Sequence, residues 1–188
     1  AARVESEKLL ASWTAEGRFM GDIRIREIIG FGSSGQVIAV SLRPNHPAFL
    51  ESCDMCLKAA PRRSSGAEAI LREIDIHATM RVDPPEHHPN VCWVYEAGFG
   101  QFPSQHKSYI SDVCYLLMRR HRCDMLHVVD MAPLSVSGAT GLLAQVMRGL
   151  THIHRLGIAH RDIKLDNLLV GPDFNVSITD FGYATRHP

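Results

Sequence analysis

Apolar and polar residues alternate along the first half of the chain in the manner of half-buried strands. Residues 23 to 29, IRIREII, show this alternation most clearly, and a second apolar run follows a glycine-rich stretch at residues 36 to 42. Further strand-like runs lie at residues 54 to 59, 91 to 95 and 113 to 118. The pattern therefore predicts a first region built mainly of strands.

Helical spacing marks three other stretches. Residues 3 to 16 carry an apolar stripe, for which we expect packing on the same domain, with partner binding as the alternative. Ser65 and Glu68 form a capping box before the helical pattern AEAILREIDIHATM. Apolar residues recur at helical intervals from residue 138, and Gly157 is expected to end that helix. The second part of the chain is therefore predicted to be more helical than the first.

A tight hairpin is predicted where the triplet GPD separates the apolar runs at residues 168 to 170 and 176 to 178. Glycine, proline and aspartate are residues that turns prefer. If the turn is centred near Asp173, facing residues have numbers that add up to about 346, which sets Asp180 opposite Asp166 and Asn167. Paired strands lie about 5 Å apart, so Asp180 and Asn167 are expected to offer oxygen ligands to one Mg²⁺ ion.

The composition is that of a globular protein without a strong overall charge. Of 188 residues, 45% are hydrophobic, and 20 basic residues balance 20 acidic ones. No global field attracts nucleic acid or an acidic membrane, and the chain has neither an apolar run of about 18 residues nor a signal-like leader. The five cysteines are irregularly spaced, which predicts reduced thiols. We therefore expect a soluble cytoplasmic protein, with the nucleus as the alternative, and no nucleic acid or membrane partner.

A glycine-rich segment, GFGSSG at residues 30 to 35, joins the first two predicted strands. Glycines let backbone N–H groups approach a phosphate closely, although this pattern alone occurs in several kinds of loop. A dinucleotide-binding loop opens a helix and a P-loop ends in Gly-Lys-Ser/Thr, whereas this segment leads into a strand. A phosphate-covering loop between two strands is the interpretation that remains.

Lys58 lies on the next predicted strand, on the same face as Cys56 because strand side chains alternate. A lysine below a nucleotide needs a carboxylate partner, and Glu73 in the following helix is the best candidate. Taken alone, Lys58 and Glu73 would be ordinary surface charges. Their interpretation depends on the motifs around them.

The glycine loop, Lys58 and Glu73 are followed along the chain by HRD at residues 160 to 162 with Asn167, and by DFG at residues 180 to 182. In their order and spacing, these motifs resemble the signature set of eukaryotic protein kinases, from about residue 21 to the end of the chain. A lysine two residues after Asp162, Lys164, resembles the pattern of the Ser/Thr branch of that family rather than that of the Tyr branch.

The resemblance implies an α+β fold of two lobes. Residues 1 to 20 would be a helical extension and residues 21 to 118 a strand-rich N-lobe with one main helix. Residues 119 to 188 would form the hinge and a partial, mainly helical C-lobe. The chain stops six residues after Gly182, before the rest of the activation segment. We therefore expect a piece of a longer chain, with low activity by itself.

The resemblance also implies roles for individual residues. Asp162 would accept the proton of the attacking hydroxyl group, and Lys164 would neutralise charge on the γ-phosphoryl group. Lys58, held by Glu73, would fix the α- and β-phosphates. The implied Mg²⁺ ligands are Asn167 and Asp180. The implied ATP-binding residues are Gly30, Phe31, Gly32, Ser33, Ser34, Gly35, Val37, Cys56, Lys58, Met118, Arg120, Asp124 and Leu169.

The implied function is that of a Ser/Thr protein kinase, which transfers the γ-phosphoryl group of MgATP to protein hydroxyl groups. Its partners would be a protein substrate and a regulatory partner on the N-lobe or the N-terminal helix. The alternative is a non-catalytic, kinase-like scaffold or regulatory fragment that binds nucleotide, favoured by the incomplete lobe and by His77, where the family commonly has an aliphatic residue. A small-molecule phosphotransferase is disfavoured by the complete glycine loop and by Lys164.

Overall fold

The computed structural model describes residues 19–20, 22–32, 34–49, 54–80, 87–103 and 110–186. The helix predicted at residues 3 to 16 and Ser33 of the glycine loop lie outside the described residues. The chain divides into two compact units, Ala1–Leu71 with Val94–Arg120 and Arg72–Trp93 with His121–Pro188. The domain boundaries expected from the sequence stay a prediction.

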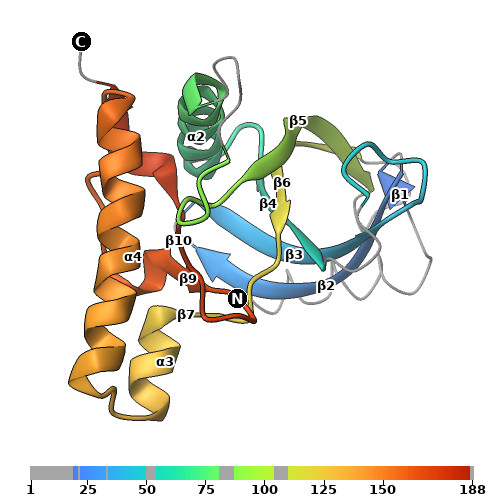
Figure 1. The fold of residues 1–188 in the computed structure, drawn as a ribbon. Helices are drawn as coiled ribbons and strands as arrows, with labels where there is room; N and C mark the ends of the chain where they lie inside the picture. Colours follow the sequence, from blue (N-terminus) through green and yellow to red (C-terminus); the bar gives the residue numbers. More distant parts are fainter. Residues whose placement is uncertain are drawn as a thin grey trace. The chain divides into compact units, whose positions relative to one another are not determined.

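The first unit contains a six-stranded antiparallel sheet in the order β1-β2-β3-β4-β6-β5 (Figure 1). The last strand of this sheet in sequence order, β6, lies between β4 and β5, so β5 forms the edge of the sheet. The strands are β1 Phe19–Met20, β2 Ile23–Gly32, β3 Gly35–Leu42, β4 Met55–Pro61, β5 Val94–Pro103 and β6 Ile110–Arg119.

The sequence pattern located β2, β3, β4 and β6, and each of these strands extends beyond its predicted bounds. The strand predicted at residues 91 to 95 is wrong in its bounds, because β5 begins at Val94. Val91 instead makes a single parallel bridge to Ile178, whose carbonyl oxygen accepts the N–H of Cys92 at 2.8 Å. An apolar run predicts that its residues are buried, but it does not identify the strand with which they form hydrogen bonds.

The core of the first unit lies on one face of its sheet. Ile38, Leu57 and Leu117 are register partners on three neighbouring strands, and all three are almost fully buried. Residues directly opposite each other point to the same side, so this row forms one layer of the core. The other buried members are Ile23, Ile25, Val40, Met55, Ala59, Val113 and Tyr115.

Helix α2, Ser65–Met80, belongs to both units, since the division falls between Leu71 and Arg72. It begins at Ser65 itself, so Ser65 is not the residue before the helix that the predicted capping box required. The buried residues of α2 include two polar ones, which need polar partners when they are removed from water. These buried residues are Ala67, Ile70, Glu73, Ile76, His77 and Met80.

The second unit combines two further helices with two small antiparallel sheets, one of three strands in the order β10-β9-β7 and one of β11 with β8 (Figure 1). Its helices are α3 Met125–Met131 and α4 Val136–Arg155, and its 3₁₀ turns are η1 Leu165–Asn167 and η2 Phe181–Tyr183. Its strands are β7 Cys123–Asp124, β8 Ile158–Ala159, β9 Leu168–Val170, β10 Val176–Ile178 and β11 Thr185–Arg186.

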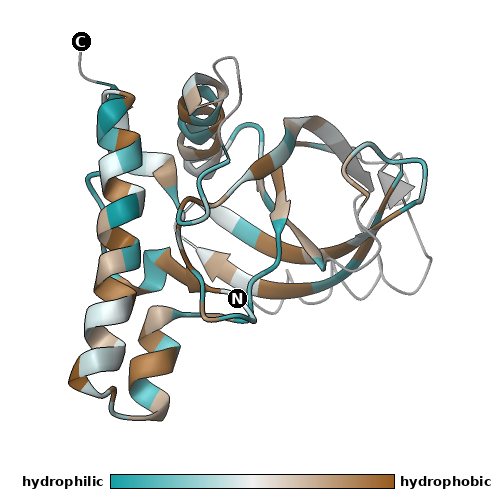
Figure 2. Cartoon of the chain, viewed as in Figure 1, coloured by the Kyte–Doolittle hydropathy of each residue, from teal (hydrophilic) through white to brown (hydrophobic). Residues whose placement is uncertain are grey.

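The helix predicted from residue 138 is confirmed as α4, which begins two residues earlier, at Val136. Ser135 caps its N-terminus, where the side chain accepts the N–H of Gly138 at 3.0 Å. Beyond its C-terminus, Gly157 has a φ of 70°, the left-handed conformation that commonly ends helices. Apolar and polar residues alternate along α4 (Figure 2), and the helix buries Val146 and Ile153 in the core of the second unit.

Several large apolar residues of α3, α4 and the segment that joins them are solvent-exposed in the second unit. Val136 is 85% exposed, and the others are Leu126, Met131, Leu134, Leu143 and Met147. None of the helices in the described ranges is long and apolar enough to cross a membrane.

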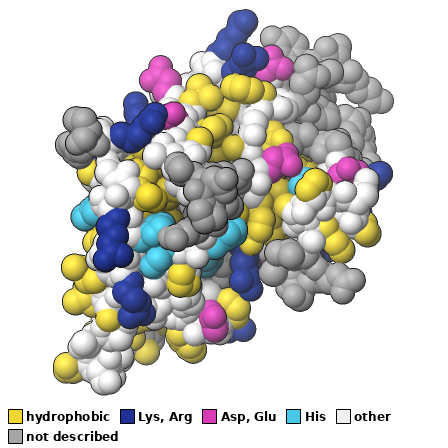
Figure 3. All heavy atoms as spheres, turned by 45° about the horizontal axis from the view of Figure 1, so that its top comes forward, with side chains coloured by type: hydrophobic (Ala, Val, Ile, Leu, Met, Phe, Trp, Pro, Cys, Tyr) yellow, Lys and Arg dark blue, Asp and Glu magenta, His cyan; other side chains and the backbone are white. Residues whose placement is uncertain are grey.

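Histidine side chains gather on the face drawn in Figure 3. Within the second unit, the rings of His88 and His152 stack with their centroids 4.7 Å apart. Burial lowers the pKa of His88, and the nearby His152 and Arg148 add to this shift by charge repulsion. His88 also accepts the N–H of Asn90 at Nδ1, 3.1 Å away, which fixes the ring beside α4.

Candidate active site

His160 connects the two segments that carry the predicted catalytic and metal-binding acids. Its ring is buried, and Nε2 lies 2.9 Å from the main-chain oxygen of Thr179. Nδ1 accepts the N–H of Asp162 at 3.3 Å. Burial lowers the pKa of His160, so the ring is neutral at pH 7, donating through Nε2–H and accepting at Nδ1. The neutral imidazole therefore links the backbone of Asp162 to the strand that leads to Asp180.

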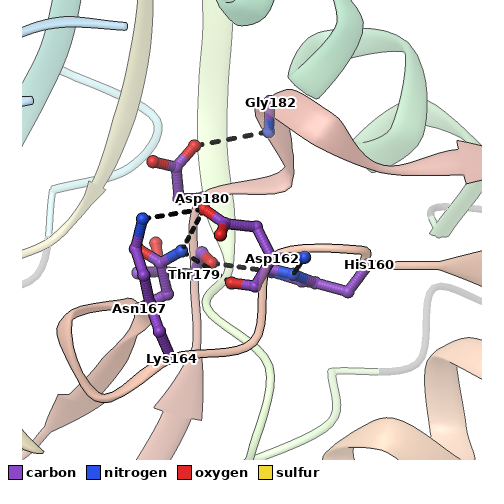
Figure 4. Close-up of polar contacts among 7 residues, drawn as sticks. All are labelled: His160, Asp162, Lys164, Asn167, Thr179, Asp180 and Gly182. Carbon is purple, nitrogen blue, oxygen red and sulfur yellow. Dashed lines mark hydrogen bonds and ion pairs between the residues drawn. The ribbon is translucent and has the colours of Figure 1, made fainter. Parts of the chain in front are cut away.

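Two side chains from the loop that follows Asp162 contact its carboxylate (Figure 4). Lys164 Nζ lies 2.9 Å from its Oδ2 atom, and Asn167 Nδ2 donates to the same oxygen at 3.0 Å. The same Nδ2 atom also donates to the main-chain carbonyl oxygen of Asp162 at 2.8 Å. Two polar contacts thus fix the orientation of the Asp162 carboxylate, and a third holds its main chain.

These contacts favour the charged form of both partners, so they shift the two pKa values in opposite directions. The hydrogen bond from Lys164 lowers the pKa of Asp162, and the bond from Asn167 adds to this effect, although burial opposes it. The hydrogen bond to Asp162 raises the pKa of Lys164, and the charges of Asp162, Asp166 and Asp180 raise it further. At neutral pH the pair is therefore a carboxylate and an ammonium, and Asp162 can act only as a hydrogen-bond or proton acceptor.

The predicted hairpin is confirmed, and so is its register. β9 and β10 have the predicted bounds, and the partners are Leu168 with Ile178, Leu169 with Ser177 and Val170 with Val176. The pattern continues past the strands, because the N–H of Thr179 donates to the carbonyl oxygen of Asn167 at 3.0 Å. Asp180 therefore follows directly on the residue that is bonded to Asn167.

Asp180 occupies an unusual backbone conformation, with a φ of 61° and a ψ of 72°. Few residues other than glycine adopt this left-handed region, and strain of this kind is concentrated at functional sites. Its Oδ1 atom accepts the N–H of Gly182 at 3.3 Å, which turns the side chain back over the next residues. The carboxylate of Asp180 is directed by this local bond.

Asn167 and Asp180 provide a donor set that suits Mg²⁺. The Nδ2 atom of Asn167 is engaged with Asp162, which leaves the amide oxygen Oδ1 as the atom that can face a cation. Mg²⁺ takes hard oxygen ligands and commonly uses one or two protein groups, with water and phosphate oxygens completing its octahedron. The described ranges contain no cluster of three or more His, Cys, Asp or Glu side chains that could hold a metal without such additional ligands.

Phe181 is fully buried between two histidine rings of the second unit. Its ring centroid lies 5.1 Å from that of His77 and 4.8 Å from that of His160, both in edge-on geometry. Its N–H donates to Oε1 of Glu73, a carboxylate that is only 1% exposed, at 3.2 Å. The predicted ion pair between Glu73 and Lys58 stays a prediction, while the bond to Phe181 gives Glu73 a partner that the sequence did not indicate.

The predicted nucleotide-binding residues of the first unit share one face of the sheet. Val37 lies opposite Lys58, and Cys56 lies opposite Met118. Because Cys56 and Lys58 are two residues apart on β4, the pairing places all four side chains on the face opposite the core. Lys58 is 8% exposed, so its aliphatic stem is packed against this face.

The glycine loop is a continuation of the β2-β3 hairpin. Gly30 pairs with Val37, and Gly32 pairs with Gly35, so Phe31 projects from a narrow ribbon and is about half exposed. Gly35 has a φ of 144°, and a Cβ atom there would lie 2.4 Å from the carbonyl oxygen of Ala59. This position therefore requires glycine for both its conformation and its close approach to β4.

The remaining predicted ATP-binding residues have structural contacts of their own. Ser34 is buried. The N–H of Arg120 donates to the carbonyl oxygen of Asp54 at 2.8 Å. Asp124, the predicted ribose contact, caps α3 by accepting the N–H of His127 at 2.8 Å, and it is the register partner of Leu169. A nucleotide contact by Asp124 would therefore share its carboxylate with the helix cap.

A buried asparagine, Asn90, for which the sequence predicted no contact, is hydrogen-bonded to the hairpin. Asn90 Nδ2 donates to the carbonyl oxygen of Val176 at 2.8 Å and lies near Oε1 of Gln145 and Oδ1 of Asn175, at 3.1 and 3.2 Å. Its main-chain oxygen accepts the N–H of Ile178 at 3.0 Å. The sequence signal was only the polar triplet His-Pro-Asn before an apolar run.

Comparisons with known proteins agree with this arrangement. A family model for the protein kinase domain matches residues 23–188. The chain is 28% identical to the probable serine/threonine-protein kinase KCC4 of Saccharomyces cerevisiae, over 88% of this chain and 15% of that protein. It is 26% identical to the serine/threonine-protein kinase PLK4 of Xenopus tropicalis and 29% identical to that of Drosophila yakuba, over 88% and 92% of this chain. These matches cover 16% and 20% of the two PLK4 proteins, so the chain spans a fifth or less of the length of these relatives.

Proposed function

Because the chain belongs to the protein kinase domain family, we propose that it is the ATP-binding and catalytic region of a Ser/Thr protein kinase. The reaction is transfer of the γ-phosphoryl group of MgATP to a serine or threonine hydroxyl group of a protein. Lys164 next to Asp162 supports the Ser/Thr branch, as does the similarity to serine/threonine-protein kinases. The cytoplasm remains the expected location.

The observation that carries this proposal is the fixed carboxylate of Asp162. A lysine and an asparagine both bind its Oδ2 atom, at 2.9 and 3.0 Å, so its orientation is set before any substrate arrives. Preorganised polar groups accelerate reactions because they need not be reoriented as charge develops. A carboxylate held in this way can orient the attacking hydroxyl group and receive its proton.

Asp162 is a weak base, since Lys164 and Asn167 lower its pKa. Phosphoryl transfer passes through a loose transition state, in which little negative charge builds on the attacking oxygen before the bond to phosphorus forms. The proton therefore moves late, and the main work of Asp162 is to align the hydroxyl group. Lys164 supplies positive charge close to the same oxygen, where it can neutralise the transferred phosphoryl group.

In this proposal, different residues bind Mg²⁺, the phosphates and the adenine ring. Asn167 and Asp180 would hold Mg²⁺, which supplies charge neutralisation for the β- and γ-phosphate oxygens when it is bound. Lys58 would bind the α- and β-phosphates below the glycine loop. Val37, Cys56 and Leu169 would contact the adenine ring, and the main chain at Arg120 would bind its polar edge.

The test is phosphate transfer by the purified protein that carries this chain. It is incubated with γ-labelled ATP, Mg²⁺ and a peptide library that contains serine, threonine and tyrosine, and the labelled amino acids are identified. We expect label on phosphoserine and phosphothreonine, and none when Mg²⁺ is chelated. Label confined to phosphotyrosine or to a small molecule would contradict the proposal.

A binding measurement separates the kinase from a scaffold that only holds nucleotide. ATP at about 100 times its dissociation constant raises the free energy of unfolding by about 2.7 kcal/mol in either case. A protein that gains this stability with MgATP but transfers no label to any peptide or to itself would be the scaffold. A kinase shows both effects.

A further inference from the structure

The segment after Asp180 is bound by two neighbouring residues of α2. Nη1 of Arg72 donates to the carbonyl oxygen of Gly182 at 2.6 Å, and Oε1 of Glu73 accepts the N–H of Phe181 at 3.2 Å. The main chain of Gly182 thus acts as the acceptor, and that of the preceding Phe181 acts as the donor. The backbone directly after Asp180 is therefore held by helix α2.

The same segment is bound again further along the chain. Arg186 forms an ion pair with Asp75, one helical turn beyond Arg72 on α2. On the other side, β11 pairs with β8, and Nε of Arg161 donates to the carbonyl oxygen of Tyr183 at 2.7 Å. The segment is therefore clamped between α2 and the loop that carries the catalytic residues.

We propose that Arg72 and the Asp75–Arg186 ion pair are positioning residues for Asp180, an inference that rests on the proposed function. Asp180 has a φ of 61°, and its carboxylate accepts a bond from Gly182, the residue whose carbonyl Arg72 holds. Displacement of this segment from α2 would release that carbonyl and let the backbone at Asp180 return to a common conformation. Docking of the segment on α2 therefore sets the direction of the metal-binding carboxylate.

The ion pair is suited to positioning rather than to stabilising the fold. The side chains of Arg186 and Asp75 are 53% and 59% exposed, and exposed ion pairs contribute little to global stability. The contact of Arg72 is a charge-assisted hydrogen bond to a carbonyl oxygen, which is stronger than a bond between neutral groups. Loss of either contact should therefore change the local order of the segment much more than the unfolding of the protein.

The first experiment exchanges the charges in the intact protein. The variants are Asp75→Arg, Arg186→Asp and the double variant, and the measurement is amide hydrogen exchange in the peptide that covers residues 180–186. We expect exchange about three- to tenfold faster in each single variant and a return to within about twofold of the wild type in the double variant. Equal exchange in all four proteins would overturn the proposal, whether or not the protein transfers phosphate.

The second experiment measures phosphate transfer against Mg²⁺ concentration. In Arg72→Ala and in each single charge reversal, the Mg²⁺ concentration for half-maximal rate should rise about three- to tenfold, with a smaller change in kcat. Arg72→Lys should lie between Ala and wild type, and the double charge exchange should recover. Arg155→Ala, at the exposed end of α4, is the matched control and should behave as wild type.

The two experiments distinguish a failure of the proposed positioning role of α2 from a failure of the proposed function. Faster exchange with an unchanged Mg²⁺ dependence would overturn the positioning role. A wild-type protein that transfers no phosphate would contradict the proposed function, while the exchange measurement would still decide whether α2 holds the segment.

Discussion

The side-chain amide of Asn167 donates to both the carbonyl oxygen and the carboxylate of Asp162, at 2.8 and 3.0 Å. One residue thereby orients the proposed proton acceptor, and its amide oxygen Oδ1 remains for the proposed Mg²⁺ ion. The N–H of Thr179 donates to the carbonyl oxygen of the same asparagine at 3.0 Å, directly before Asp180, the second proposed Mg²⁺ ligand. Asn167 therefore contacts both Asp162 and the segment that leads to Asp180.

Replacement of Asn167 should cost stability as well as activity. In Asn167→Ala two hydrogen bonds to Asp162 are lost, one of them to its charged carboxylate, and this loss should cost about 1–3 kcal/mol. Urea denaturation measures this loss. Asn45→Ala is the matched control, because its side chain binds Asp22 at the surface and should change stability by about 0.5 kcal/mol or less. Equal stability of both variants would contradict the account of Asn167.

Two glycines of α4 should respond in opposite ways to alanine. At Gly149 a Cβ atom would lie 2.5 Å from the carbonyl oxygen of Asn90 and 2.9 Å from Cδ1 of Ile178, so Gly149→Ala should destabilise by about 1–3 kcal/mol. At Gly141 nothing lies within 4 Å, and alanine should stabilise the helix by about 0.5–1 kcal/mol. Thermal or urea unfolding of the two variants checks both signs. Similar effects of both substitutions would show that α4 does not approach Asn90 in this way.

The glycine loop offers a comparable pair for nucleotide binding. Gly35→Ala forces a Cβ atom to within 2.4 Å of the carbonyl oxygen of Ala59 in a conformation that alanine rarely adopts, so the hairpin must distort. At Gly30 the nearest atoms are 3.8 Å away, which is ordinary contact. We expect ATP affinity to fall about tenfold or more in Gly35→Ala and less in Gly30→Ala, as measured by a binding titration. Equal losses would contradict the assigned geometry of the loop.

The buried neutral His160 predicts acid sensitivity. Burial sets its folded-state pKa below the unfolded value of about 6.5, so the unfolded chain binds more protons once the pH falls below that value. The free energy of unfolding should be fully retained above pH 6.5 and fall with decreasing pH until the folded pKa is passed. One such group contributes a slope of at most about 1.4 kcal/mol per pH unit.

Denaturation of His160→Gln at pH 7.5 and 5.5 tests this expectation, since the variant cannot titrate there. The loss of stability between the two pH values should be smaller than in the wild type. His88 has a lowered pKa for the same leading reason and should behave likewise in His88→Gln. His154→Gln, at an exposed position of α4, is the control and should keep the wild-type pH dependence. An unchanged slope in His160→Gln would contradict a neutral buried ring.

The hairpin could be predicted from sequence because its determinants are local. The triplet GPD fixes the turn between two short apolar runs, and the register that follows pairs residues whose numbers add up to 346, as Val170 and Val176 do. Once the register is known, the neighbourhood of Asn167 and Asp180 follows from strand geometry alone. The strand face that carries Cys56 and Lys58 follows in the same way from side-chain alternation.

Contacts between distant parts of the sequence could not be predicted from these patterns. Arg72 binds Gly182, and Asn90 binds Val176, across separations of 110 and 86 residues. Arginine in a helix and asparagine after proline are common at surfaces, so neither residue type signals its partner. The same limit explains the wrong bounds of the strand predicted at residues 91 to 95, where Val91 and Cys92 pair with Ile178 of β10 and β5 begins only at Val94.

The rate of phosphate transfer by Asp162→Asn tests the central claim most directly. The substitution keeps the size of the side chain but removes the charge that Lys164 and Asn167 hold in place. With saturating MgATP and a serine peptide, kcat should fall about 10²- to 10⁴-fold, while ATP affinity changes little. Asp130→Asn, an exposed residue of α3, should keep the wild-type rate. A wild-type rate in Asp162→Asn would contradict Asp162 as the group that aligns and deprotonates the attacking hydroxyl.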